Sequence, residues 1–127
     1  EADPGNSYAL NGLGRLYFDF REFEQAAACW QRMLAADPGN VRVLTCLGNC
    51  SRKLKDFSQG LGYFESALAL DPQNFYALFG LADCCRGLGR HRESLAAWKR
   101  ILAGDFGPGD EVRVEVVEGG LAFRRAG

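Results

Sequence analysis

The chain has 127 residues, of which 47% are hydrophobic and 24% are charged, as expected for one globular domain. Its 15 basic and 16 acidic residues give a net charge of -1, which argues against a generic nucleic-acid-binding protein, because such proteins carry a basic excess. No apolar run reaches the roughly 18 residues that a membrane-spanning helix needs, so we expect neither nucleic acid nor membrane as a partner.

A repeated four-residue break divides the chain. Asp-Pro-Gly-Asn stands at residues 3–6 and 37–40, and Asp-Pro-Gln-Asn stands at 71–74, so successive prolines lie 34 residues apart. Proline stops a helix, and the residues that follow it here favour a turn and the start of a new helix. We therefore expect three helical units, at residues 7–40, 41–74 and 75–108.

The first unit has helical apolar spacing in two segments. Leu10, Leu13 and Tyr17 share one face of a first helix, and Ala26 and Trp30 share one face of a second. The same spacing recurs in the next units, at Leu44, Leu47, Leu61 and Phe64, and at Leu78, Leu81, Leu95, Trp98 and Ile101. Each unit is therefore expected to be a pair of antiparallel amphipathic helices.

Small residues recur at equivalent positions of these units. We call a set of positions that are 34 residues apart a column, and the small columns make the pattern specific. The first unit contains Leu10-x2-Leu13-Gly14-x2-Tyr17, then Ala26-x3-Trp30, then Pro38. This pattern, repeated over residues 3 to about 105, resembles the tetratricopeptide repeat (TPR) family. The resemblance implies an all-α, right-handed superhelical solenoid of helix hairpins in a single domain over residues 1–127. It also implies a non-enzymatic scaffold or adaptor without a cofactor, whose concave wall, built from the first helices, binds a peptide of a partner protein.

Residues 111–125 are expected to form a closing helix of a partial fourth repeat. Gly120 aligns with the small column of Gly14, and Phe123 aligns with Tyr17. The alternating valines from Val112 favour a strand instead, but a strand on a helical solenoid would lack a pairing partner. The helix is the preferred prediction, and the chain is expected to be a piece of a longer protein.

The outward-facing residues of the first helices are the candidate peptide-binding site. Arg15, Arg52 and Arg86 are expected to contact carboxylates, and Asn49 is expected to hold peptide backbone, as the family resemblance implies. Tyr8, Tyr76 and Phe79 would supply apolar anchors. The full candidate groove comprises Tyr8, Asn11, Arg15, Phe18, Arg42, Thr45, Asn49, Arg52, Lys53, Tyr76, Phe79, Asp83 and Arg86.

The charges of this wall predict the chemistry of the partner. Five basic residues stand against the two acidic residues Asp19 and Asp83, which favours acidic peptides or a free C-terminal carboxylate. Some family members bind chaperone tails through a carboxylate clamp, which the resemblance places as Asn, Lys and Arg at the positions of Cys46, Tyr76 and Gly80. Because these three residues differ here, the clamp is expected to be absent. Two other functions stay open: self-assembly through the solenoid ends, and service as the regulatory arm of an enzyme whose catalytic domain lies elsewhere.

The chain has five cysteines and one histidine, which limits the catalytic and metal sites that it can form. An odd cysteine count does not suit a disulfide framework, and together with the lack of a signal peptide it favours a cytoplasmic location. Cys46 and Cys50 have metal-compatible spacing, but four thiolates would have to converge on one ion. We therefore expect the cysteines to be small apolar filler, with no metal site.

Overall fold

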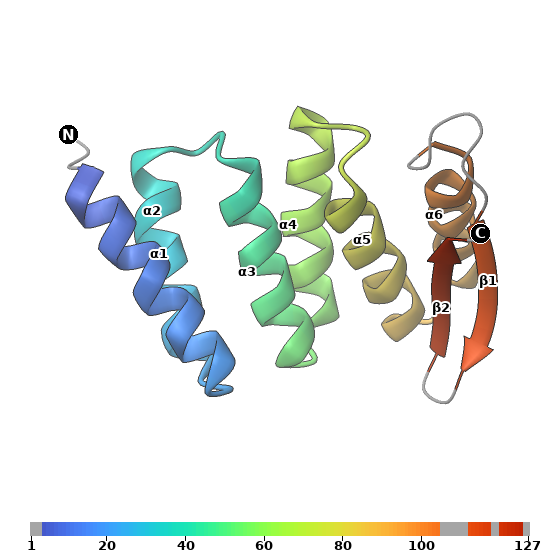
Figure 1. Ribbon diagram of the computed structural model, residues 1–127, viewed down its shortest axis with the longest axis horizontal. Helices are drawn as coiled ribbons and strands as arrows, with labels where there is room; N and C mark the ends of the chain where they lie inside the picture. Colours follow the sequence, from blue (N-terminus) through green and yellow to red (C-terminus); the bar gives the residue numbers. More distant parts are fainter. Residues whose placement is uncertain (1–3, 105–111, 118–119, 126–127) are drawn as a thin grey trace.

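Six helices stand side by side in chain order, forming an elongated array of hairpins (Figure 1). The computed structural model describes residues 4–104, 112–117 and 120–125. None of the helices in this part of the chain is long and apolar enough to cross a membrane. The all-α solenoid predicted from the 34-residue period is confirmed, with helices α1 (Pro4–Asp19), α2 (Phe23–Ala36), α3 (Val41–Lys53), α4 (Phe57–Leu70), α5 (Phe75–Gly87) and α6 (His91–Gly104).

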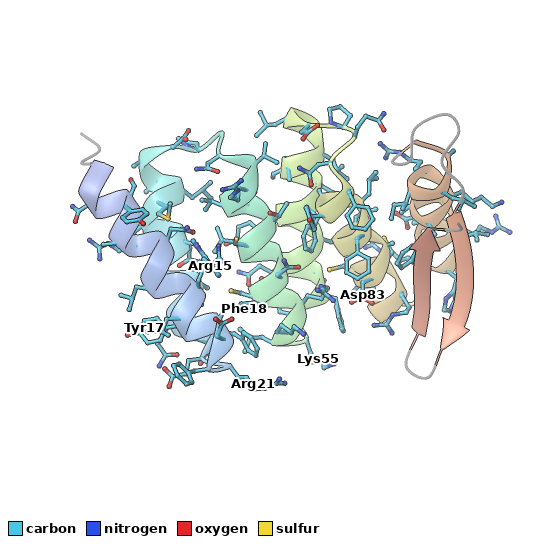
Figure 2. The ribbon with its side chains drawn as sticks, viewed as in Figure 1. Arg15, Tyr17, Phe18, Arg21, Lys55 and Asp83 are labelled. Carbon is cyan, nitrogen blue, oxygen red and sulfur yellow. The ribbon has the colours of Figure 1, made fainter. Side chains whose placement is uncertain are left out.

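The turn inside each hairpin reverses the chain through one residue in the left-handed backbone region. This residue is Arg21 in the first hairpin (φ 64°), Lys55 in the second (φ 67°) and Gly89 in the third (φ 78°). Glycine adopts this conformation freely, whereas arginine and lysine do so at a steric cost. Arg21 and Lys55 lie at the same edge of the array (Figure 2), so the first two hairpins turn at that edge.

Two asparagines begin the first helices of the second and third hairpins. The side chain of Asn40 accepts a hydrogen bond from the backbone N–H of Val43 (3.2 Å), and that of Asn74 accepts one from Ala77 (3.0 Å). Each bond satisfies a backbone donor that a helix start leaves without an intrahelical partner. The repeated break therefore ends one helix with proline nearby and caps the next with asparagine.

The core consists of aromatic rings seated on glycines. Phe64 is fully buried, and its ring lies against Gly48 of its own hairpin and Gly80 of the following one. Trp30 is also buried and lies against Gly14. The small columns thus allow close approach of the helices, as the sequence predicted.

The predicted closing helix over residues 111–125 is wrong. Two antiparallel strands occupy this region, β1 (Val112–Val117) and β2 (Gly120–Arg125), with Val112 opposite Arg125 and Val117 opposite Gly120. The alternating valines favour extended backbone, and each strand finds its hydrogen-bonding partner in the other. Residue 111, with which that helix was expected to begin, lies outside the described residues.

Candidate functional site

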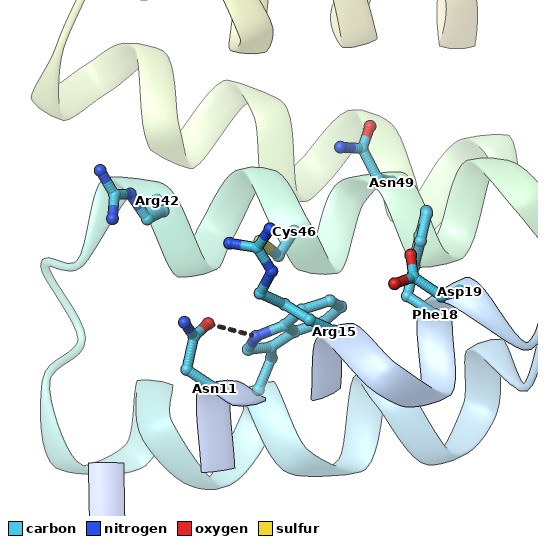
Figure 3. A pocket seen from close by; sticks show the side chains of 8 residues that line it. Asn11, Arg15, Phe18, Asp19, Arg42, Cys46 and Asn49 are labelled. Atoms are coloured by element: carbon cyan, nitrogen blue, oxygen red, sulfur yellow. Dashed lines mark hydrogen bonds between the residues drawn. The ribbon is translucent and has the colours of Figure 1, made fainter. Parts of the chain in front are cut away.

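A cavity of about 230 Å³ opens between α1 and α3 on the wall that the sequence marked as the groove (Figure 3). Five of the predicted groove residues line it together, namely Asn11, Arg15, Phe18, Arg42 and Asn49. The other lining residues are Asp19, Trp30 from α2, and Cys46.

The floor of the cavity is aromatic and rigid. The indole N–H of Trp30 donates a hydrogen bond to Asn11 Oδ1 (3.2 Å), while Phe18 packs edge-on against Phe23 with ring centroids 5.0 Å apart. Trp30 is only 2% exposed and is held close to α1 because Gly14 has no side chain. The Phe18 ring is tilted by 56° against that of Trp30 and is only half-buried, so Phe18 supplies most of the apolar surface that a ligand can reach on this floor.

The rim of the cavity carries two guanidinium groups. Arg15 and Arg42 are exposed, and neither forms an ion pair with a carboxylate of the described residues. Burial raises the pKa of the Cys46 thiol between them, although the charges of Arg15 and Arg42 lower it in part. The thiol therefore stays neutral at neutral pH, and the charged side chains that line the cavity are the two arginines and the single carboxylate of Asp19.

A second hollow continues this surface toward α5. Arg42 and Asn49 line both hollows, and Thr45 and Tyr76 line the second one. Tyr76 is 67% exposed, in agreement with the exposed anchor that the sequence predicted. The surface therefore runs without a break from α1 across α3 to the start of α5. Its remaining lining residues are Val41, Asp71 and Asn74.

Arg52 lies elsewhere, in a network with α5, and is not the exposed cation that was expected. Its side chain is 19% exposed, and it donates to Asp83 Oδ2 at 3.0 Å and to Asn49 Oδ1 at 3.3 Å. The guanidinium also lies over the ring of Phe79, 5.3 Å from its centroid. The charge of Arg52 is thus already paired within the molecule.

Arg86 shares the same acidic partner. Its Nε donates to Asp83 Oδ1 at 2.9 Å, so Asp83 lies between two arginines. Burial by itself raises the pKa of Asp83, but the hydrogen bonds and charges of Arg86 and Arg52 outweigh it, and the pKa lies below its ordinary value. Asp83 lies on α5, well along the array from Arg15 on α1 (Figure 2). The unpaired cationic charge of the groove is therefore concentrated at its α1–α3 end.

Other predicted groove residues have structural contacts instead of an open position. Phe79 is half-buried, stacks on Phe75 (6.3 Å between centroids) and meets Trp98 edge-on (5.5 Å). Thr45, expected to face outward, is only 8% exposed, and its hydroxyl donates to the backbone carbonyl of Arg42 (2.7 Å). Lys53 is exposed and lines neither hollow, and Tyr8 lines a separate hollow on α1.

Two cavity residues were missed as groove members at the sequence level. Trp30 was assigned to the core, and Cys46 was treated as small filler beside the wall. Cys46 occupies the column of Gly12 and Gly80, where its bulk differs from the two glycines. That departure within an otherwise glycine column was the available signal that the α2–α3 junction, which borders the cavity, differs from the α4–α5 junction.

Burial keeps the thiols of α3 and α5 protonated at neutral pH. Burial, reinforced by Cys46, raises the pKa of Cys50 to about 12, and burial with the charge of Asp83 raises that of Cys84 to about 11. Protonated thiols bind metals poorly, because the thiolate is the ligand. No cluster of potential metal ligands is present among the residues that the structure describes.

Comparison with known proteins identifies the repeat. The tetratricopeptide repeat model matches residues 1–41, 11–58 and 52–111. The chain belongs to the tetratricopeptide repeat family. TPR domains are generally non-catalytic, and this chain is accordingly a protein–protein interaction module.

Solved TPR structures have the same fold. The first TPR domain of Spaghetti (RPAP3), bound to the HSP90 peptide SRMEEVD, superposes with a TM-score of 0.75 at 22% identity, covering 80% of this chain and 81% of that one. The type III secretion translocator chaperone SycD of Yersinia enterocolitica gives 0.76 at 17% identity, covering 80% and 76%. MamA (AMB-1) gives 0.73 at 26% identity, covering 80% and 60%. No curated protein sequence matches the chain.

Proposed function

We propose that this TPR domain binds an extended acidic peptide segment of a partner protein along the surface formed by α1, α3 and α5. The observation that carries the proposal is the pair of guanidinium groups, Arg15 and Arg42, over the cavity floored by Trp30. An acidic side chain or a C-terminal carboxylate of the peptide pairs with these two cations. Charged groups that are not already paired are the ones that add affinity for a ligand.

The second hollow extends the same site. Asn49 uses its carbonyl oxygen to accept from Arg52, so its NH2 group is left to donate to a peptide carbonyl. Tyr76, exposed at the far side of that hollow, supplies an apolar contact two helices away from Arg15. A ligand that reaches both must be extended, which favours a linear peptide over a compact small molecule.

The similar Spaghetti domain was solved with a peptide whose last four residues are Glu-Glu-Val-Asp, and this acidic peptide supports a groove ligand of the proposed type. The clamp residues of chaperone-binding relatives are replaced here by Cys46, Tyr76 and Gly80. The proposed carboxylate contact is therefore made by Arg15, which stands at one of the two clamp positions of the first helix, and by Arg42, which stands outside the clamp. The chemical class of the ligand is the same, an acidic peptide, but the set of residues that binds it is different.

Selection from a random 12-residue peptide library on the immobilised chain tests this proposal. We expect the selected peptides to be enriched in Asp and Glu together with at least one aromatic or aliphatic residue. The double variant R15A/R42A should weaken their binding about tenfold or more, because two charge contacts of about 1 kcal/mol or more are lost. Fluorescence anisotropy at low and high salt measures the loss and its ionic-strength dependence.

The matched control is Arg32→Ala, which removes an exposed arginine from α2, outside all three hollows. It should leave peptide affinity unchanged. Selected peptides without acidic residues, or equal binding to wild type and R15A/R42A, would place peptide binding outside the α1–α3 cavity.

A further inference from the structure

The cavity between α1 and α3 has opposite charges at its two ends. Arg42 lies at one end and Asp19 at the other, with Arg15 between them (Figure 3). The guanidinium of Arg15 points toward Cys46 and away from Asp19, although Arg15 and Asp19 are about one helical turn apart on α1. The cavity is therefore dipolar and not uniformly cationic.

The carboxylate of Asp19 is not used inside the described part of the molecule. Asp19 is exposed, and no ion pair or hydrogen bond joins its side chain to another described residue. Asp83, in contrast, is half-buried between Arg52 and Arg86, which pair with its two oxygens. The charge of Asp19 thus remains for a cation that a ligand brings into the cavity.

The position of Asp19 is unfavourable for the helix that carries it. Asp19 is the last residue of α1, where the partial negative charge of the helix C-terminus disfavours a carboxylate, and the last turn of α1 holds no basic residue. The same column holds Lys53 at the end of α3 and Gly87 at the end of α5. The first hairpin thus has a carboxylate where the second has a stabilising lysine, and contact with a cationic ligand accounts for this carboxylate better than helix stability does.

The length of the cavity sets the spacing of the ligand charges. Arg15 and Asp19 are separated by about 6 Å along the axis of α1. On α3, Arg42 is separated by about 10 Å from Asn49, which Figure 3 shows on the side of Asp19. An extended peptide advances about 3.3 Å per residue, so an acidic and a basic residue that reach both ends stand about two to four residues apart.

We propose that this cavity selects a peptide segment of mixed charge, in which an Asp or Glu pairs with Arg15 and Arg42 and a Lys or Arg pairs with Asp19. Such selectivity rests on the proposed function and narrows its ligand class from any acidic peptide to one that also carries a basic residue. The aliphatic stem of that residue packs on the half-buried ring of Phe18, which lies beside Asp19 (Figure 3). A second acidic residue at this end is repelled, so Asp19 determines specificity by attraction and by repulsion.

Parallel selections from a random peptide library on wild type and on Asp19→Lys test the charge order. Peptides selected on wild type should carry a Lys or Arg about two to four residues from an Asp or Glu. Those selected on Asp19→Lys should lose this basic residue and gain an acidic one in its place. Basic residues without a fixed spacing from the acidic ones, or the same peptides selected by both chains, overturn the proposal.

Fluorescence anisotropy then measures the pairing directly, with a peptide selected on wild type and with the same peptide carrying alanine in place of its basic residue. Asp19→Asn should weaken binding of the first peptide about threefold, as expected for one solvent-exposed ion pair, and should leave binding of the second unchanged. The urea midpoint of Asp19→Asn should equal or exceed that of wild type, because a carboxylate is removed from a helix C-terminus. An affinity loss caused by unfolding would instead affect both peptides.

Glu65→Gln is the matched control, since it removes an exposed carboxylate of α4 that lies outside all three hollows. It should bind both peptides like wild type. Equal binding of the first peptide by Asp19→Asn and wild type overturns the selectivity of Asp19, while weaker binding of that peptide by R15A/R42A still supports the proposed function. Equal binding by R15A/R42A as well overturns both.

Discussion

The ring of Phe64 lies between two glycines, Gly48 in its own hairpin and Gly80 in the next. A Cβ at Gly48 would lie 2.5 Å from Phe64 Cζ, and a Cβ at Gly80 would overlap the ring. Phe64 is fully buried, so its ring has no solvent-filled space into which it can move. One aromatic residue thus fixes both the closure of a hairpin and its contact with the following hairpin.

Gly80→Ala is therefore expected to destabilise the fold although alanine is the better helix former. Overpacking of a buried ring costs about 1–3 kcal/mol, more than the roughly 1 kcal/mol that the glycine-to-alanine change contributes to helix propensity. Gly62→Ala, where a Cβ meets nothing within 4 Å, should instead stabilise the fold by about 1 kcal/mol or less. Urea unfolding followed by circular dichroism measures both, and a gain in stability for Gly80→Ala would contradict the packing around Phe64.

The ion pair between Arg52 and Asp83 is a feature of the site that the sequence alone does not predict. The column pattern predicted that Arg52 and Asp83 belong to the same wall, but not that they lie 3.0 Å apart. Cross-repeat pairing depends on the rotation of α5 against α3, which sets distances between side chains 31 residues apart in sequence. The sequence therefore provides a count of the charges expected on this wall, whereas their pairing, and with it the charge left for a ligand, comes from the structure.

At the level of elements, the three related Asp-Pro breaks do not act alike. Asn40 and Asn74 cap α3 and α5 with side-chain hydrogen bonds. Helix α1 begins at Pro4, so Asn6, the equivalent of Asn40 and Asn74, lies inside the helix. The same sequence signal therefore has two structural outcomes: an asparagine cap before α3 and α5, and an asparagine inside α1.

Asn40→Ala and Asn74→Ala are each expected to lower the free energy of unfolding by about 1 kcal/mol, because each removes the acceptor of a helix N-terminal N–H. Asn6→Ala should be neutral or stabilising by up to about 0.7 kcal/mol, since alanine is favoured inside a helix. Chemical denaturation of the three variants measures these changes. An equal loss for Asn6→Ala would indicate that Asn6, and not Pro4, marks the functional start of α1.

The two strands that replace the expected closing helix show a limit of period-based prediction. The alignment of Gly120 and Phe123 with the repeat columns favoured a helix, while the alternation of Val112, Val114 and Val116 favoured a strand. The strand was rejected because a helical solenoid offers it no edge. A hairpin provides its own edge through local pairing, which a comparison with the preceding repeats does not consider.

On the scale of the whole molecule, the 34-residue period was sufficient to predict the six helices and their order, because each hairpin contacts mainly its neighbours. The position of the cavity between α1 and α3 was harder to predict from the sequence. It depends on how Trp30, Cys46 and Phe18 from three helices fill one junction, and no single column records that combination. The repeat architecture is thus local in sequence, while the site is a property of one particular junction.

The same nearest-neighbour architecture predicts unequal local stability along the chain. Helix α3 packs against α2, α4 and α5, and seven of its residues are buried. Helix α1 has its main contact with α2, leaves Leu13 and Leu16 exposed, and contains Gly12 and Gly14 in its interior. A helix with one covered side and two interior glycines opens at a lower free energy than one covered on several sides.

Hydrogen exchange followed by mass spectrometry should therefore show protection factors at least about tenfold lower in α1 than in α3, equivalent to about 1.4 kcal/mol, at low micromolar concentration. Equal protection of α1 and α3 in dilute solution would mean that the three hairpins open as a single cooperative unit. In that case the exposed face of α1 has no energetic cost for the isolated domain, and the stability of its end would have to come from contacts within the first hairpin alone.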